Sequence, residues 1–504
     1  MSGSVSIGRQ QVSLVELREH GARAATGFSQ LGVSAGDCVA TLLRNDFSCF
    51  EVAFAADLLG VYVAPINWHN KSSEVVHVIQ DSGARILVAH DDLLAAVQSD
   101  IPDNVNVFVV PSGTNVGASV GDDNVLTLWQ DWLNSFNEWQ GEAPPPVGSM
   151  IYTSGTTGLP KGIRRQPPHP KNLPVIKKIK DQMFGFSTGQ EIRTVVTGPL
   201  YHSAPYRWAL DSAAANAFIA IQQRFDAEDL LSLIETHSIT HLQMVPTMFW
   251  RLLKLPEEIR GKYDLCSLEY VVHAAAPCPP GVKQSMLDWW GPIIHEYYGA
   301  SEIGPISLAN PDDAVRKPGT VGRLLEGAKI MVLDDDGNEV GTSQIGEFYL
   351  RQTLWPDFDY HNKPEERAAL EKDGLVTVGD VGYVDEDGYL FLMDRAKDMV
   401  ISGGVNIYPA ETEAVLVTMP EIADCAVIGI PDREFGERLL AFVVRSGDSD
   451  IDSQGIIKWL SSKISGYKVP REYVFQDSLP REDSGKVFKK ELRSQYWVDS
   501  DAKI

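Results

Sequence analysis

The sequence has few features of a secreted or disulfide-stabilised protein. Only five of its 504 residues are cysteines, and no two of them form a C-x-x-C pair. A small, odd number of cysteines is typical of reduced thiols and excludes a disulfide scaffold. The N-terminal residues, MSGSVSIGRQQVSLVEL, also lack the apolar run of a signal peptide. We therefore expect a cytoplasmic protein.

Long apolar runs and excess positive charge are missing as well. The longest apolar stretches, near residues 52–66 and 209–221, are interrupted by Asp57 and by Asp211 and Asn216. Neither reaches the ~20 apolar residues of a membrane span. The net charge is −24, whereas binding to nucleic acid or to an anionic membrane requires basic patches. The sequence predicts neither a transmembrane segment nor a nucleic-acid partner.

The length of the chain indicates more than one domain, since 504 residues exceed what a single core usually supports. Strand-like and helix-like segments alternate over residues 13–89 and again over 193–297, which predicts parallel sheets built from βαβ units. Short β-like runs separated by turns follow from about residue 317. A further boundary near Asp394 precedes a segment with the size and pattern of a small α+β domain.

Residues 152–162, YTSGTTGLPKG, carry the strongest local signal. Glycines let backbone N–H groups face a ligand, and the hydroxyls together with Lys161 suit phosphate oxygens. Apolar Met150 and Ile151 predict a strand before this loop. A Walker A loop is excluded, because Pro160 stands where its second glycine belongs. A surface turn rich in glycine, serine and threonine is the plainer alternative.

Residues 297–302, YYGASE, form a second candidate motif. His295 and Glu296 begin like a zinc-binding H-E-x-x-H, but Gly299 replaces the second histidine, so we exclude zinc. Glu302 offers the hard oxygen ligand that Mg²⁺ on phosphates prefers. An ordinary surface carboxylate is the alternative reading of Glu302.

These motifs resemble those of the AMP-forming adenylating enzymes: acyl-CoA synthetases, luciferases and the adenylation domains of peptide synthetases. The resemblance runs from about residue 10 to 492 and includes VGD at 378–380, DRAKD at 394–398, SGG at 402–404 and PREDSGK at 480–486. It implies an α/β fold whose large N-terminal domain, residues 1–393, holds two α/β subdomains and a small β-barrel-like subdomain. A small mobile α+β C-terminal domain, residues 394–504, would turn about a hinge at Asp394.

The resemblance also implies a site for ATP and Mg²⁺. Tyr298 would stack on adenine, and Asp380 and Arg395 would contact the ribose. The expected catalytic residues are Lys161, Glu302 and Lys486, and the expected metal ligands are Glu302 and Thr153. The expected ATP-binding residues are Thr153, Ser154, Gly155, Thr156, Thr157, Gly158, Lys161, Ala275, Ala276, Pro277, Tyr297, Tyr298, Gly299, Ala300, Ser301, Asp380, Arg395 and Lys486.

An acid pocket and a CoA tunnel follow from the same resemblance. Without the resemblance, the simpler interpretation of His202 is a buried or capping residue. Ser203 and Ala204 follow His202 where peptide-synthetase domains carry F-D-x-S, which disfavours amino-acid substrates. The expected acid-binding residues are His202, Tyr206, Trp208, Val245, Met248, Ala274 and Gly299, and those for CoA are Gly403 and Gly404.

The resulting prediction is an acyl-CoA synthetase that activates a medium or long fatty acid or a ring-bearing acid. It would form acyl-AMP and pyrophosphate from ATP and then transfer the acyl group to CoA. The alternatives are an acyl-AMP ligase that loads a carrier protein or another acceptor, a luciferase-like oxygenase, and an inactive nucleotide-binding homologue. A homodimer is possible, but the sequence does not decide the oligomeric state.

Residues 163–170, IRRQPPHP, depart from the V-x-x-[ST]-H run of many relatives.

Overall fold

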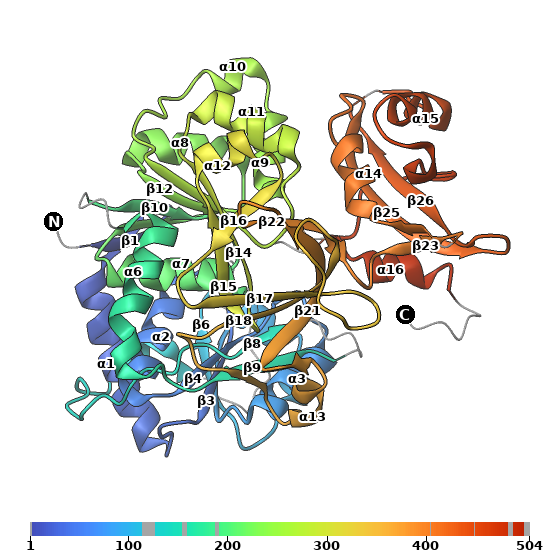
Figure 1. The fold of residues 1–504 in the computed structure, drawn as a ribbon. Helices are drawn as coiled ribbons and strands as arrows, with labels where there is room; N and C mark the ends of the chain where they lie inside the picture. The colour runs from blue at the N-terminus through green and yellow to red at the C-terminus, as the bar shows by residue number, and fades with distance from the viewer. Residues whose placement is uncertain are drawn as a thin grey trace.

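The computed structural model describes residues 3–112, 127–153, 159–186, 191–403, 405–447, 449–481 and 487–497. Figure 1 shows a large α/β body and a smaller body formed by the C-terminal residues in orange and red. The predicted fold class, a large N-terminal α/β domain with a small C-terminal α+β domain, is confirmed.

The large body is organised around one mixed sheet of 14 strands. The part formed by β1, β11, β10, β12, β13 and β14 is parallel, as the alternation of strands and helices predicts. Its strands are β1 (Ser4–Ile7), β10 (Arg193–Val196), β11 (Phe218–Ile221), β12 (His241–Met244), β13 (Tyr270–His273) and β14 (Ile294–Ala300), and β2 (Gln10–Ser13) is antiparallel at the edge. Its helices are α6 (Leu173–Phe184), α7 (Ser203–Ala214), α8 (Ala227–His237), α9 (Pro246–Leu253), α10 (Glu257–Arg260) and α11 (Pro280–Trp290).

The β-rich stretch predicted after residue 317 continues this sheet. From β14 onward every pairing along the sheet is antiparallel, and the order runs β14, β15, β16, β22, β21, β18, β17. The antiparallel part thus begins with β15, before the β-like runs predicted from about residue 317. These elements are β15 (Gly304–Ala309), α12 (Pro311–Arg316), β16 (Thr320–Leu324), β17 (Ala328–Leu333), β18 (Gly346–Gln352), β20 (Glu371–Lys372), β21 (Leu375–Val384) and β22 (Tyr389–Arg395).

A second parallel sheet of five strands, in the order β4, β3, β5, β6, β7, forms the other α/β unit. Its strands β3 and β5 are entirely buried, which explains their continuous apolar runs. The elements are α1 (Leu14–Gln30), β3 (Cys38–Leu42), α2 (Phe47–Leu59), β4 (Tyr62–Pro65), α3 (Ser72–Ser82), β5 (Ile86–His90), α4 (Asp91–Ala95), β6 (Asn106–Val110), β7 (Thr127–Leu128) and α5 (Trp129–Leu133).

Two local predictions differ from the structure. The apolar pattern of residues 209–217 predicts a helix that starts at Ala209, whereas helix α7 begins at Ser203. Pro205 lies in the first turn, where a helix tolerates proline because the missing N–H would have no partner there. Helix α6 was not predicted at all, although Ile176, Ile179 and Met183 form its buried face.

The C-terminal body packs a five-stranded sheet against helices. It contacts the large body at α9, where Trp250 Nε1 donates to the carbonyl of Ala423 at 2.9 Å and Lys254 Nζ to that of Ile422 at 3.2 Å. Its elements are β23 (Val400–Ser402), β24 (Val405–Ile407), α14 (Pro409–Leu416), β25 (Ile422–Asp432), β26 (Gly436–Arg445), α15 (Ser453–Ser461), β27 (Glu472–Phe475) and α16 (Lys489–Ser494).

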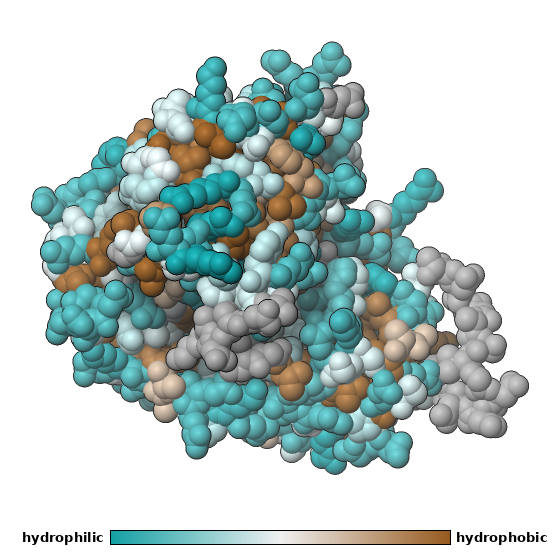
Figure 2. All heavy atoms as spheres, turned by 90° about the vertical axis from the view of Figure 1, so that its right-hand side faces the viewer, coloured by the Kyte–Doolittle hydropathy of each residue, from teal (hydrophilic) through white to brown (hydrophobic). Residues whose placement is uncertain are grey.

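In the part of the chain that the structure describes, no helix combines the length and apolar character needed to cross a bilayer. The face drawn in Figure 2 is mostly hydrophilic, with apolar residues scattered among polar and charged ones. Both observations agree with the sequence prediction that no transmembrane segment is present.

Candidate active site

The glycine-rich segment connects the two strands of a β-hairpin. Strand β8 (Ile151–Thr153) pairs antiparallel with β9 (Lys161–Arg165), and Thr153 lies directly opposite Lys161. The strand predicted before the loop is therefore present. Predicted residues Ser154, Gly155, Thr156, Thr157 and Gly158 lie outside the described residues.

A third strand, β19 (Phe358–Tyr360), pairs with β9 and brings two residues to Lys161 that the sequence analysis did not select. Lys161 Nζ forms an ion pair with Glu366, which lies on α13 (Pro364–Ala368). The same ammonium group lies 5.2 Å from the centre of the Tyr360 ring. Lys161 is thus held by a carboxylate and an aromatic face.

Tyr360 also connects Lys161 to the second predicted motif. Its hydroxyl donates to Glu302 Oε1 at 3.2 Å, and Glu302 lies in the turn between β14 and β15. In the same turn Ser301 Oγ donates to Ser203 Oγ, 3.0 Å away at the start of α7. The structure therefore brings Lys161 and Glu302, far apart in sequence, to one tyrosine: Lys161 to its ring and Glu302 to its hydroxyl.

A half-buried arginine, Arg165, fixes the turn that carries Glu302. The Arg165 guanidinium donates to the carbonyl oxygens of Ser301 and Glu302 and to that of Pro356. Burial lowers the pKa of Arg165 to about 10, which still leaves it charged near neutral pH. Arg165 belongs to the IRRQPPHP segment that departs from the family pattern. The unusual sequence drew attention to this segment, but it did not show that Arg165 contacts the turn of Ser301 and Glu302.

Strand β14 carries the predicted adenine-binding residues. The Tyr298 hydroxyl donates to Asp380 Oδ2 at 2.6 Å, and burial next to that carboxylate raises the pKa of Tyr298 well above its usual range. Asp380 pairs across β21 and β22 with Arg395, whose Nε lies 3.6 Å from Asp380 Oδ1. The predicted ribose residues therefore adjoin Tyr298. Tyr297 points instead into the core beside Phe184.

Two small residues in the predicted nucleotide-binding segments have a steric or conformational reason. A Cβ at Gly299 would lie 2.4 Å from the carbonyl oxygen of Gly304, so the tight β14–β15 turn excludes any larger residue. Ala275 has φ = 74°, a left-handed conformation that favours glycine. Predicted residues Ala276 and Pro277 follow it on the exposed connection to α11, whereas Ala274 is buried at the end of β13.

The predicted acid-binding residues divide between two core clusters. Tyr206 and Trp208 are buried in the cluster around α7, where Trp208 Nε1 donates to Thr194 Oγ1 at 2.9 Å. Val245 and Met248 are buried in the separate cluster around α9 and α11. His202 is the N-cap residue of α7 and lies with its ring centre 4.5 Å from that of Tyr201. Tyr206 and Trp208 thus pack in one core cluster, and Val245 and Met248 pack in another.

The predicted hinge lies at the junction of the two bodies. Asp394 is in β22, and its carboxylate accepts from the backbone N–H of Ala410 on α14 at 2.9 Å. Burial raises the pKa of Asp394, and the nearby Lys489 opposes this effect. In the predicted CoA loop, Gly403 has φ = 60° and donates its N–H to the carbonyl of Phe435. Gly404 and the predicted catalytic Lys486 lie outside the described residues.

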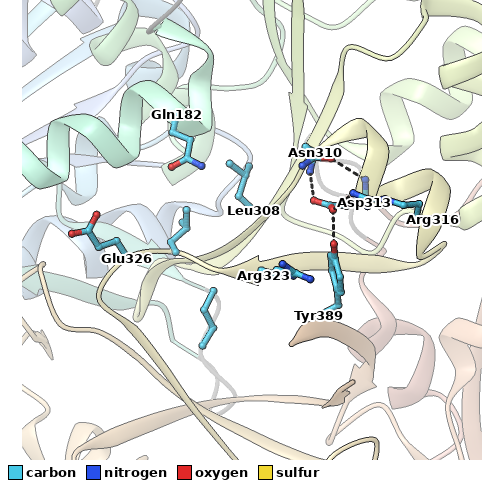
Figure 3. Close-up of a pocket in the computed structure, with 10 residues that line it drawn as sticks. Gln182, Leu308, Asn310, Asp313, Arg316, Arg323, Glu326 and Tyr389 are labelled. Atoms are coloured by element: carbon cyan, nitrogen blue, oxygen red, sulfur yellow. Dashed lines mark hydrogen bonds and ion pairs between the residues drawn. The ribbon is translucent and has the colours of Figure 1, made fainter. Parts of the chain in front are cut away.

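A cavity lies away from the predicted ATP-binding and acid-binding residues. It measures about 490 Å³ and is lined by residues of α6, α12, β15, β16 and β22, among them Asp313, Arg323 and Tyr389 (Figure 3). The Tyr389 hydroxyl donates to Asp313 Oδ1 at 2.7 Å on one wall. Of the described residues that line this cavity, none belongs to the predicted ATP or acid site.

The carboxylate content of the site bears on how a metal would be held. Among the described residues, no three His, Cys, Asp or Glu side chains gather as a metal-binding group. Mg²⁺ commonly binds to one or two carboxylates and to the phosphates of the substrate. The single carboxylate of Glu302 with the hydroxyl of Thr153 fits that mode.

The fold, a large α/β body followed by a smaller C-terminal body, is that of the adenylating enzymes. The chain belongs to the AMP-binding enzyme family: the family profile matches residues 4–354, and the profile of the AMP-binding enzyme C-terminal domain matches residues 411–486.

Curated relatives and solved structures span nearly the whole chain. A fatty acid–[acyl-carrier-protein] ligase, ScoC of Streptomyces coeruleorubidus, is 29% identical over 97% of this chain and 92% of its own. A feruloyl-CoA synthase of an Amycolatopsis species is 31% identical over 98% of this chain and 96% of its own. The ATP-bound structure of MatB from Rhodopseudomonas palustris superposes with a TM-score of 0.84, at 26% identity, over 98% of this chain and 96% of that one.

Proposed function

We propose that this protein is an ATP-dependent acyl-CoA synthetase that acts on a hydrophobic carboxylic acid. The observation that carries the proposal is that Tyr360 contacts both Lys161 and Glu302. The contacts that link Tyr298, Asp380 and Arg395 form the second part of the same candidate site. A cation, a metal-binding carboxylate and ribose-binding groups side by side match what ATP requires. A fatty acid or a ring-bearing acid such as a cinnamic-type acid is the proposed substrate class, the latter supported by the feruloyl-CoA synthase relative.

In the proposed first step, a carboxylate oxygen attacks the α-phosphorus of ATP, and the bond between the α-phosphorus and the bridging oxygen breaks to release pyrophosphate. Two anions must approach each other, so the protein has to supply positive charge and fixed geometry. Lys161 and Lys486 provide charge, while Tyr360 and Arg165 hold the turn of Glu302 in place. Mg²⁺ held by Glu302 and Thr153 would neutralise phosphate charge.

In the proposed second step, the thiol of CoA attacks the acyl carbonyl and AMP leaves. Lys486 would withdraw, and the Gly403–Gly404 loop would reach the site by rotation of residues 394–504 about Asp394, a hinge motion. The contact of the hinge residue Asp394 with Ala410 and the interdomain contact of Trp250 with Ala423 would change in this rotation.

Lys486→Ala separates the two steps. We expect it to abolish the formation of acyl-AMP while largely sparing the conversion of supplied acyl-AMP to acyl-CoA. Single-turnover assays of each half-reaction measure this. An equal loss in both half-reactions would remove Lys486 from the proposed role.

A ligase that loads a carrier protein is the second candidate, favoured by the similarity to the acyl-carrier-protein ligase. Pyrophosphate release is measured over acids graded in chain length and aromaticity, with CoA, with a phosphopantetheinylated carrier protein, or with neither. Formation of acyl-CoA supports the synthetase. Acid-dependent pyrophosphate release with acyl transfer only to the carrier protein would replace it by the second candidate.

A further inference from the structure

The lysine of the glycine-rich hairpin already has a counterion within the protein. The Lys161 side chain is only 10% exposed, and its ammonium group is paired with the carboxylate of Glu366, whose side chain is 36% exposed. A nearly buried ammonium group needs a compensating negative charge. Across the described residues, no second carboxylate forms an ion pair with Lys161.

Glu366 is held beside the small sheet that carries Lys161, on helix α13. Helix α13 follows β19, where Tyr360 pairs with Ile163 of β9, and the N–H of His361 donates to the carbonyl of Gly162 at 2.8 Å. Arg367, next to Glu366, donates to the carbonyl of Phe358 at 3.1 Å and anchors the helix. The Glu366 carboxylate therefore stays beside the hairpin because of backbone pairing and not through a chance surface contact.

On the basis of the proposed function, we propose that Glu366 competes with the phosphates of ATP for Lys161 and thereby sets the affinity for ATP. Phosphate oxygens that reach Lys161 come close to a carboxylate of the same sign of charge, which opposes binding. Lys363 Nζ lies 3.9 Å from Glu366 Oε1, so a second cation is at hand for the carboxylate when phosphate takes its place. Glu366 is then a residue that tunes ATP binding and takes no part in the chemistry.

Glu366→Gln tests the proposal because it removes the charge and keeps the size. The dissociation constant for ATP in the presence of Mg²⁺, measured by calorimetry on the full chain, is expected to fall roughly 3- to 10-fold. This gain should shrink as sodium chloride is raised, since salt screens the repulsion. Glu365→Gln, at the exposed preceding position of the same helix, is the matched control and should leave the constant unchanged.

Thermal unfolding supplies an independent readout. Without ATP, Glu366→Gln should unfold at a lower temperature than the wild type because Lys161 loses its counterion, yet ATP should raise its unfolding temperature by more. Glu366→Ala should behave in the same way. Unchanged or weaker ATP binding by both variants, in a wild type that binds ATP and releases pyrophosphate, would overturn this inference alone. A wild type that does not bind ATP would overturn the proposed function and this inference with it.

Discussion

Two lysine–glutamate pairs in this protein use the same chemistry in opposite settings. Lys283 and Glu296 pair beneath the parallel sheet, where their side chains are 5% and 6% exposed and His273 Nε2 lies 3.7 Å from the carboxylate. Lys161 and Glu366 pair at the glycine-rich hairpin, where the glutamate is 36% exposed.

The difference separates a fully buried pair from one that is partly open to solvent, as the proposed ATP site requires. Burial raises the pKa of Glu296 and keeps the pKa of His273 well below its usual range, so His273 is neutral and Lys283 is the counterion of Glu296. The Lys161 pair opens to one side and shares Tyr360 with Glu302. Both pairs have the same residue types, so only their location and exposure distinguish them: one is in the core, and the other is beside the glycine-rich hairpin.

Lys283→Met is expected to give the largest effect. It leaves the Glu296 carboxylate buried without its counterion, which typically costs about 3–5 kcal/mol of stability. Urea unfolding followed by tryptophan fluorescence measures this loss. The double variant Lys283→Met, Glu296→Met should recover most of it, and a single variant that costs less than about 1 kcal/mol would contradict the structural role of the pair.

Glu302→Gln should have the opposite effect to Lys283→Met: it should lower activity strongly and change stability little. Loss of one preorganised charged group in the site typically slows the reaction ~10²–10³-fold. The free energy of unfolding should change by less than about 1 kcal/mol, because Glu302 is only partly buried. Acid-dependent pyrophosphate release checks the rate, with Glu326→Gln at the remote cavity as the control. Equal rates in the two variants would remove Glu302 from the site.

Tyr360→Phe sharpens the comparison by removing one contact of the shared tyrosine. The ring beside Lys161 stays, but the hydrogen bond to Glu302 is lost. Hydrogen bonds to charged groups contribute ~1.5–3 kcal/mol, so kcat should fall roughly 10-fold or somewhat more. The KM for ATP should change less than kcat, since the proposed phosphate contacts of Lys161 would remain. A change confined to the KM for ATP would contradict the positioning of Glu302 by Tyr360.

A third pair, His20 and Glu51, should give the smallest effect, and one that depends on pH. His20 Nδ1 lies 2.7 Å from the nearly buried Glu51 carboxylate, and this hydrogen bond raises the pKa of His20 above 6.5. The stabilisation is complete below pH 6.5 and is lost as the pH rises through the raised pKa. Urea midpoints of the wild type should therefore fall with pH over this window, while those of His20→Gln stay flatter. Parallel curves would exclude the pair as the cause.

Much of the fold followed from the sequence because its signals are local. The buried runs of β3 and β5 and the periodic pattern of α8 each fit their element without help from distant residues. Helix α6 was missed because Pro174 and its lysines obscure a period that only Ile176, Ile179 and Met183 reveal. Trp208 was assigned to the acid pocket, yet its indole is packed in a core where Thr194 satisfies its N–H.

The candidate site was predictable only where a motif carried it. Lys161, Glu302 and Asp380 each sit in a recognisable segment, and the structure brings the first two to Tyr360. Tyr360 and Glu366 were not selected, because their contacts with Lys161 depend on the pairing of β19 with β9, which are distant in sequence. Arg165 was not selected, because its contacts with the carbonyls of Ser301 and Glu302 are equally distant in sequence. Neither residue type nor spacing shows that pairing, so the partners of Lys161 emerge only from the folded chain.

The central claim is that ATP is split between its α- and β-phosphorus atoms to activate a carboxylic acid. Phosphorus NMR of the purified protein with Mg²⁺, ATP, CoA and a panel of hydrophobic acids tests it most directly. We expect AMP and pyrophosphate in equal amounts, and only when an acid is present. Formation of ADP and phosphate, or no acid-dependent consumption of ATP across the panel, would contradict it.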